Sequence, residues 1–156
     1  MIRLEIGNDC FNYRIAGVAI HENSVLLHQG EGEDFWTFPG GRAEFGETAE
    51  QTLKREMREE IGADVEVVRL LWFVESFYTY EDIQTHEIAL YFLMQLPSAP
   101  EYKGSFQGEE ETMKLTFQWF PLHLEVLSSL PLLPSFLQTA LQELPESVQH
   151  VIHYGK

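Results

Sequence analysis

Cysteine is scarce in this sequence, and long hydrophobic runs are absent. The single cysteine, Cys10, excludes an intrachain disulfide and a metal cluster held by thiolates. No apolar run approaches the ~18 residues that a membrane helix requires. The first residues, MIRLEIGNDCFNYR, do not join a basic segment to an apolar one as a signal peptide does. We therefore expect a cytoplasmic protein that has no membrane partner.

Positive charge is also in short supply. The chain has 10 Lys and Arg residues against 25 Asp and Glu residues, which gives a formal net charge of -15. Nucleic-acid binding depends on clustered Lys and Arg, and no such cluster occurs here. We therefore expect no nucleic-acid polymer as a partner. A small anionic substrate suits this chain only if metal cations mediate the contact.

What is present is typical of one globular domain. Of the 156 residues, 44% are hydrophobic and 22% are charged, without repeats, low-complexity tracts or linkers. Residues 1–156 are therefore expected to form a single domain. Segments rich in β-branched and aromatic residues predict strands, and a helical apolar period predicts a helix. The expected elements are strands at 14–20, 24–28, 65–80, 84–96 and 113–120, and a helix at 49–61.

The connections are expected to be short turns, one long loop and a helical end. The two longest strands should form a hairpin that turns near residues 81–82. Residues 97–112 are expected to be a loop that carries three consecutive glutamates at 109–111. From residue 122 onward, Leu-rich segments broken by prolines predict two short helices and a tail. The sum is a mixed α/β domain in which helices cover a sheet.

The ends of the helix at 49–61 are marked by capping residues. Thr48, with Gln51 three residues later, predicts a capping box. Gly62 suits the left-handed position that follows many helices.

This helix carries glutamates on the side where apolar residues belong. At about 100° per residue, Glu60 falls inside the apolar arc, Glu56 lies at its edge and Glu59 lies on the neighbouring flank. The arc itself is formed by Ala49, Leu53, Met57 and Ile61. A solvated acidic face is the simplest alternative, but the solvated side of this helix is the opposite one.

A carboxylate that faces an apolar environment must gain a proton, a cationic side chain or a metal ion. Arg55 can pair with Glu59 at i,i+4 but cannot satisfy all three acids. Glutamates at i, i+3 and i+4 are expected to converge their oxygens on one point, which suits Mg²⁺ or Mn²⁺. Metal binding is therefore the favoured interpretation of these residues.

Other phosphate and hydrolase motifs fit less well. The segment GRAEFGET has the outline of a phosphate loop, but Glu47 stands where that loop needs a lysine. There is no D-x-D-x-D-G calcium loop and no G-x-S-x-G nucleophile motif.

Residues 41–63, GRAEFGETAEQTLKREMREEIGA, resemble the Nudix box: G, five residues, E, seven residues, then R-E-U-x-E-E-x-G-U, where U is a bulky aliphatic residue. The last position departs from the pattern, because Ala63 is small. The preceding Phe38-Pro39-Gly40 is also similar to the usual lead-in. The positions that match are Gly41, Glu47, Arg55, Glu56, Met57, Glu59, Glu60 and Gly62.

The resemblance implies a Nudix-type α/β/α sandwich with a mixed β-sheet. It also implies hydrolysis of a nucleoside diphosphate linked to another group, with Mg²⁺ or Mn²⁺ as cofactor, and suggests a homodimer. Glu56, Glu59 and Glu60 would be the metal ligands, with the carbonyl of Gly40 as an addition. Arg55 would orient these acids, and Glu47 would support the helix entrance.

The general base and the substrate contacts stay open. The base is expected to be Glu56, Glu59 or one of the glutamates at 109–111. Arg14 and Arg42 are candidates for phosphate contacts, although surface salt bridges are an equal alternative. Candidates for stacking on a base are Phe35, Phe77, Tyr78 and Tyr80, with a core role as the alternative. His86 is a candidate for lining the substrate pocket, with a core or surface role as the alternative.

One alternative to an enzyme is a Nudix module that senses a nucleotide or binds a protein without catalysis. The sequence retains all three candidate metal ligands, which favours the enzyme.

Overall fold

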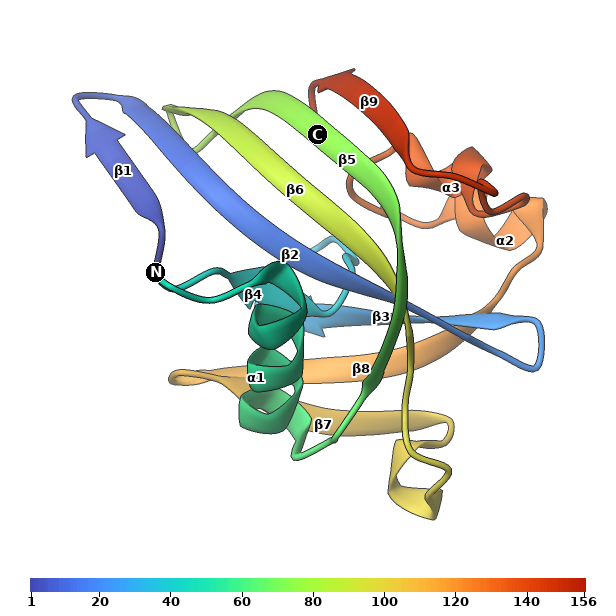
Figure 1. The fold of residues 1–156 in the computed structure, drawn as a ribbon. Coiled ribbons are helices and arrows are strands. Elements are labelled where there is room, and N and C mark those ends of the chain that lie inside the picture. Colours follow the sequence, from blue (N-terminus) through green and yellow to red (C-terminus); the bar gives the residue numbers. More distant parts are fainter.

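The computed structural model describes residues 1–156, which form nine β-strands, three α-helices and one 3-10 helix, η1 (Figure 1). The strands are β1 (Arg3–Ile6), β2 (Asp9–His21), β3 (Ser24–Gly30), β4 (Gly40–Arg42), β5 (Glu66–Tyr80), β6 (Ile83–Gln95), β7 (Ser105–Glu110), β8 (Met113–Pro121) and β9 (Gln149–Tyr154). The helices are α1 (Ala49–Ile61), η1 (Pro100–Tyr102), α2 (Leu124–Ser129) and α3 (Leu137–Ala140).

The strands form one mixed sheet in the order β7-β8-β3-β2-β6-β5-β9, with β1 and β4 also paired to β2. Most neighbours are antiparallel, whereas β2 with β6 and β5 with β9 are parallel. The expectation of a mixed sheet is confirmed. Strand β2 joins the two parts of the sheet, because its last residues pair with β3 while its body pairs with β6.

Two hydrophobic cores lie on the two sides of the sheet, because successive side chains of a strand point to opposite faces. Ala16 and Val18 of β2 contribute to a core that includes Leu127 of α2 and Leu137 of α3. Ile15 and Ala19, the alternate residues of the same strand, contribute to a second core with Leu53 and Met57 of α1. Helix α1 and the pair α2 and α3 accordingly lie on opposite sides of the sheet in Figure 1, which confirms the α/β/α sandwich.

Two-residue turns close the hairpins that the sequence predicts. Glu22 and Asn23 join β2 to β3, and Glu81 and Asp82 join β5 to β6, all four with positive φ between 49° and 64°. Left-handed residues at both central positions match the right-handed twist of the flanking strands.

Two expectations about connecting segments are wrong. Residues 97–112 are not a plain loop, because they contain η1 and strand β7, which places Glu109 and Glu110 in an antiparallel pair with β8. The expected tail contains β9, which pairs in parallel with β5. The sequences of these two strands are polar, SFQGEE in β7 and QHVIHY in β9, so they carry little local strand signal. They belong to the sheet because each pairs with a neighbouring strand. No helix is long and apolar enough to cross a membrane.

Candidate functional site

Helix α1 has the limits and caps that its sequence predicts. The Thr48 hydroxyl accepts a hydrogen bond from the Gln51 amide at 3.2 Å, and the Gln51 side-chain oxygen accepts one from the Thr48 amide at 2.9 Å. Gly62 ends the helix with φ 67°. These bonds satisfy amide groups that would otherwise lack partners, and so they fix the first residue of the helix. The helical period then sets the side on which each acidic side chain lies.

The predicted burial of the acidic side chains is confirmed for Glu56 and Glu60. Both are buried alongside Leu53 and Met57, whereas the side chain of Glu59 is 61% exposed. The apolar arc therefore presents two carboxylates to the protein interior.

Glu60 is the most isolated of these acids. The residue is 4% exposed, and neither carboxylate oxygen has a hydrogen-bond partner. Burial raises the pKa of Glu60 to about 9, and the negative charges of Glu110 and Glu56 add to the rise. Burial also raises the pKa of Glu56, against the lowering effect of its bond from Arg55. No cationic side chain donates a hydrogen bond to Glu60.

Arg55 links the acids around the helix. Its Nε donates to Glu47 Oε2 at 2.7 Å, and its Nη1 donates to Glu56 Oε1 at 2.9 Å and Glu59 Oε2 at 3.2 Å. Its Nη2 donates to the carbonyl of Arg42 at 3.1 Å. The hydrogen bond from Arg55 is the main reason why the pKa of Glu47 is lowered to about 2. The predicted pairing of Arg55 with Glu59 is confirmed, and Glu60 receives none of these bonds.

Gly41 lets the β4 backbone approach Glu56 closely. A Cβ atom at this position would lie 2.3 Å from the carboxyl carbon of Glu56, closer than real Cβ atoms come. A glycine here therefore leaves room for a carboxylate beside the strand.

A cavity of about 730 Å³ collects most of the predicted residues. Arg14 and Arg42 line it, together with Arg55 and the three candidate metal ligands. Burial acts to lower the pKa of Arg14, but Glu87 and other negative groups outweigh it and the pKa is raised. Of the aromatic candidates, Phe35, Tyr78 and Tyr80 line this cavity.

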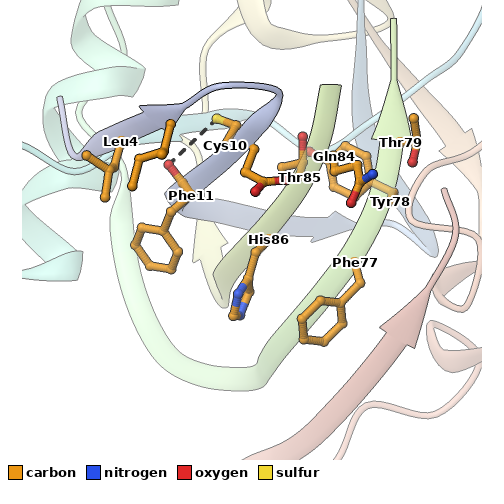
Figure 2. Close-up of a pocket in the computed structure, with 11 residues that line it drawn as sticks. Leu4, Cys10, Phe11, Phe77, Tyr78, Thr79, Gln84, Thr85 and His86 are labelled. Carbon is orange, nitrogen blue, oxygen red and sulfur yellow. Dashed lines mark hydrogen bonds between the residues drawn. The ribbon is translucent and has the colours of Figure 1, made fainter. Parts of the chain in front are cut away.

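Phe77 and His86 lie elsewhere. They line a second cavity of about 530 Å³ with Leu4, Cys10 and Phe11 (Figure 2). Phe11, His86 and Phe77 sit opposite one another on β2, β6 and β5, and their side chains extend to the same side. The two residues therefore do not belong to the wall that carries the glutamates.

The glutamates at 109–111 also line the large cavity, on β7 and at the turn after it. Among them, Glu110 is the one whose charge raises the pKa of both Glu60 and Glu56. Strand β7 therefore brings Glu110, which is distant in the sequence, close to helix α1.

Several residues of this cavity are absent from the sequence-based candidates, and three of them are buried groups with polar side chains of particular interest. Asn12 of β2 and Glu87 of β6 are buried in its wall and joined by a hydrogen bond of 2.8 Å, and His28 of β3 is buried there without a partner for Nδ1. No local signal marked Asn12 and Glu87, because both lie in the polar first halves of their strands and are buried only through strand pairing.

The donor set suits a hard divalent cation. A buried carboxylate with two unpartnered oxygens beside further carboxylates is chemically matched to Mg²⁺ or Mn²⁺. As the side chains stand, no three His, Cys, Asp or Glu residues are gathered closely enough to hold an ion. Ligation by Glu56, Glu59 and Glu60 therefore stays a prediction.

Comparison with known proteins gives a consistent family signal. The family model described as the NUDIX domain matches residues 12–139. An 8-oxo-dGTP diphosphatase of Proteus vulgaris is 48% identical over 54 residues, which are 35% of this chain and 46% of that protein. The match thus spans less than half the length of this relative.

Solved structures share the fold at low identity. The MutT protein from Bacillus halodurans superposes with a TM-score of 0.60 at 19% identity, covering 92% of this chain and 90% of that one. An ADP-ribose pyrophosphatase from Streptococcus suis gives a TM-score of 0.57 at 16% identity, covering 90% and 98%. At this identity the likeness concerns the fold.

Proposed function

This chain belongs to the Nudix family, and from that membership we propose that it hydrolyses the diphosphate linkage of a small nucleotide-type substrate with Mg²⁺ or Mn²⁺ as cofactor. The observation that carries the proposal is the Glu60 carboxylate, which is buried in the wall of a large cavity with both oxygens unpartnered. A buried charge is retained at such cost only where a partner compensates it. The similarity to a diphosphatase and to the fold of a pyrophosphatase supports the same reaction.

Glu56, Glu59 and Glu60 would hold the cation, which when bound offsets the charge of the diphosphate and lowers the pKa of water. Arg55 keeps Glu56 and Glu59 oriented through its hydrogen bonds. Arg14 and Arg42 line the same cavity and would contact phosphate oxygens.

Glu110 is our choice of general base. It accepts the proton of the attacking water, the water oxygen forms a bond to phosphorus, and the bridging oxygen leaves with the other phosphate. Two observations support this choice: Glu110 lines the same cavity as the three predicted ligands, and its negative charge contributes to the raised pKa of Glu60 and Glu56. Glu56 and Glu59 are already engaged by Arg55.

The test is a hydrolysis assay on nucleoside triphosphates, ADP-ribose, sugar nucleotides and dinucleoside polyphosphates with Mg²⁺ or Mn²⁺. We expect turnover of at least one substrate, loss of turnover with EDTA, and loss of most activity in Glu59→Gln. Glu110→Gln should lower kcat by about 10²–10⁴-fold, the usual worth of a general base.

Glu50→Gln is the matched control, because Glu50 lies on the exposed side of the same helix. It should keep the activity of the unmodified protein. Nucleotide binding without turnover of any substrate would instead support the non-catalytic, sensing alternative.

A further inference from the structure

Glu87 presents a free carboxylate oxygen to the cavity. The residue is 8% exposed and lies in the cavity wall, on β6. Its Oε2 accepts hydrogen bonds from Asn12 Nδ2 at 2.8 Å and from the Tyr78 hydroxyl at 3.3 Å. No protein group donates to Oε1, which is nevertheless not sealed in the interior as the oxygens of Glu60 are. Oε1 can therefore accept a hydrogen bond from a ligand bound in the cavity.

The neighbours of Glu87 hold it in one orientation. The Asn12 side chain donates to Glu87 through Nδ2 and accepts from Arg42 Nε through Oδ1. Because a carboxylate only accepts and a guanidinium only donates, these two partners fix the orientation of the amide. In register, Asn12 stands opposite Glu87, and Glu87 stands opposite Ser76 of β5. Three adjacent strands therefore support this carboxylate, as expected of a recognition group rather than a loose surface acid.

The same bonds connect Glu87 to the box helix. Arg42, which holds Asn12, accepts a bond on its carbonyl from Arg55, and Arg55 holds Glu56. Glu87, Tyr78, Tyr80 and the candidate metal ligands of α1 line the same cavity, and the two tyrosines give it aromatic surface. A ligand whose diphosphate lies at the glutamates of α1 can therefore extend a planar group toward Glu87.

We propose that Glu87 recognises the base of the substrate and selects a guanine-type edge, in which a ring N–H and an amino group donate side by side. This inference rests on the proposed function. An ionised carboxylate has about four acceptor positions, and Asn12 and Tyr78 take two of them. Both of these bonds are on Oε2, so the remaining positions are on Oε1, which can accept a ring N–H and the adjacent amino N–H together in a charge-assisted contact.

Other bases fit this carboxylate less well. Adenine and cytosine place a ring acceptor beside their amino group, and uracil flanks its N–H with two carbonyl oxygens. An acceptor held against a carboxylate is repelled, which disfavours these edges.

The test compares binding of GMP and IMP in the presence of Mg²⁺. Neither compound contains a diphosphate linkage, and they differ only in the 2-amino group that donates in GMP. A hydrogen bond to a charged group is worth a factor of about 10 to 100, so GMP should bind more tightly than IMP by that factor. AMP should bind more weakly than GMP.

Glu87→Gln should reduce the preference for GMP over IMP to less than about twofold. His86→Gln is the matched control, because His86 is the adjacent residue of β6 and points into the other cavity (Figure 2). It should keep the preference of the unmodified protein. Equal binding of GMP and IMP by the unmodified protein, which needs no variant to fold, overturns the inference, as does an unchanged preference in a folded Glu87→Gln.

The two proposals fail separately. Selective GMP binding without hydrolysis of any substrate would refute the proposed function and support base recognition by Glu87. Hydrolysis together with equal GMP and IMP binding would refute base recognition alone.

Discussion

At the residue scale, the molecule buries titratable groups of two kinds. Glu60 is buried among carboxylates, which act against its ionised form. His28 is buried near Arg14, and its ring packs edge-on against Phe117 with the centroids 5.2 Å apart. Burial lowers the pKa of His28 to about 3, and the positive charge of Arg14 adds to this effect. A bound cation would stabilise the ionised form of Glu60, whereas His28 must stay neutral in the folded protein.

His28 should make the protein sensitive to mild acid. Its folded pKa of about 3 lies below the ordinary value of 6.5, so the unfolded chain binds a proton first as the pH falls. The stability associated with neutral His28 is complete above pH 6.5 and is lost toward pH 3, at about 1.4 kcal/mol per unit. Between pH 7 and 5, the free energy of unfolding should fall by about 2 kcal/mol more in the unmodified protein than in His28→Gln.

Urea denaturation at the two pH values measures this difference. His21→Gln is the control, since His21 lies on the same hairpin with a side chain that is 66% exposed. It should follow the unmodified protein. A parallel decline of stability in His28→Gln and the unmodified protein would contradict the expectation.

At the scale of elements, local sequence predicts α1 and the long hairpins well. The limits of α1 coincide with the predicted ones because its capping box and Gly62 act within a few residues of the helix. The turn at Glu81 and Asp82 is likewise a local feature. Strands β7 and β9 were missed because their membership in the sheet depends on partners, β8 and β5, that local sequence does not identify.

Removing the cap of α1 should weaken the fold. Thr48→Ala deletes the hydroxyl that accepts from the Gln51 amide, and the loss of such a cap costs about 1 kcal/mol of stability. Thr48→Ser retains the hydroxyl and should keep most of that stability. Chemical denaturation measures both variants, and equal stability of Thr48→Ala and the unmodified protein would show that the capping bond contributes nothing.

At the scale of the whole molecule, a chain with a formal net charge of -15 arranges several carboxylates around one cavity. Arg55 compensates Glu47, Glu56 and Glu59 by direct hydrogen bonds but does not reach Glu60. A cation that binds only the folded protein should therefore stabilise it.

Thermal unfolding with and without Mn²⁺ tests this coupling. The melting temperature of the unmodified protein should rise with Mn²⁺, by an amount equivalent to about 2.7 kcal/mol at a hundred times the dissociation constant. Glu60→Gln should melt at or above the metal-free protein, because an amide does not ionise and avoids the cost of burying a carboxyl group whose pKa folding raises to about 9. It should lose the rise with Mn²⁺.

Glu50→Gln should keep the full rise with Mn²⁺, since Glu50 is exposed at the start of α1. An undiminished rise in Glu60→Gln would remove Glu60 from the predicted ligands.

The sequence by itself determined the family, the box helix and the burial of Glu56 and Glu60, because helical period and capping are properties of neighbouring residues. Only the tertiary structure decided which distant residues join them. Glu110 reaches the box helix through strand pairing of β7, and Glu87 meets Asn12 through a parallel pair 75 positions apart in the chain. The separation of Phe77 and His86 from the large cavity was decided in the same way, because the face that a strand residue occupies depends on which strands pair and how the helices cover them.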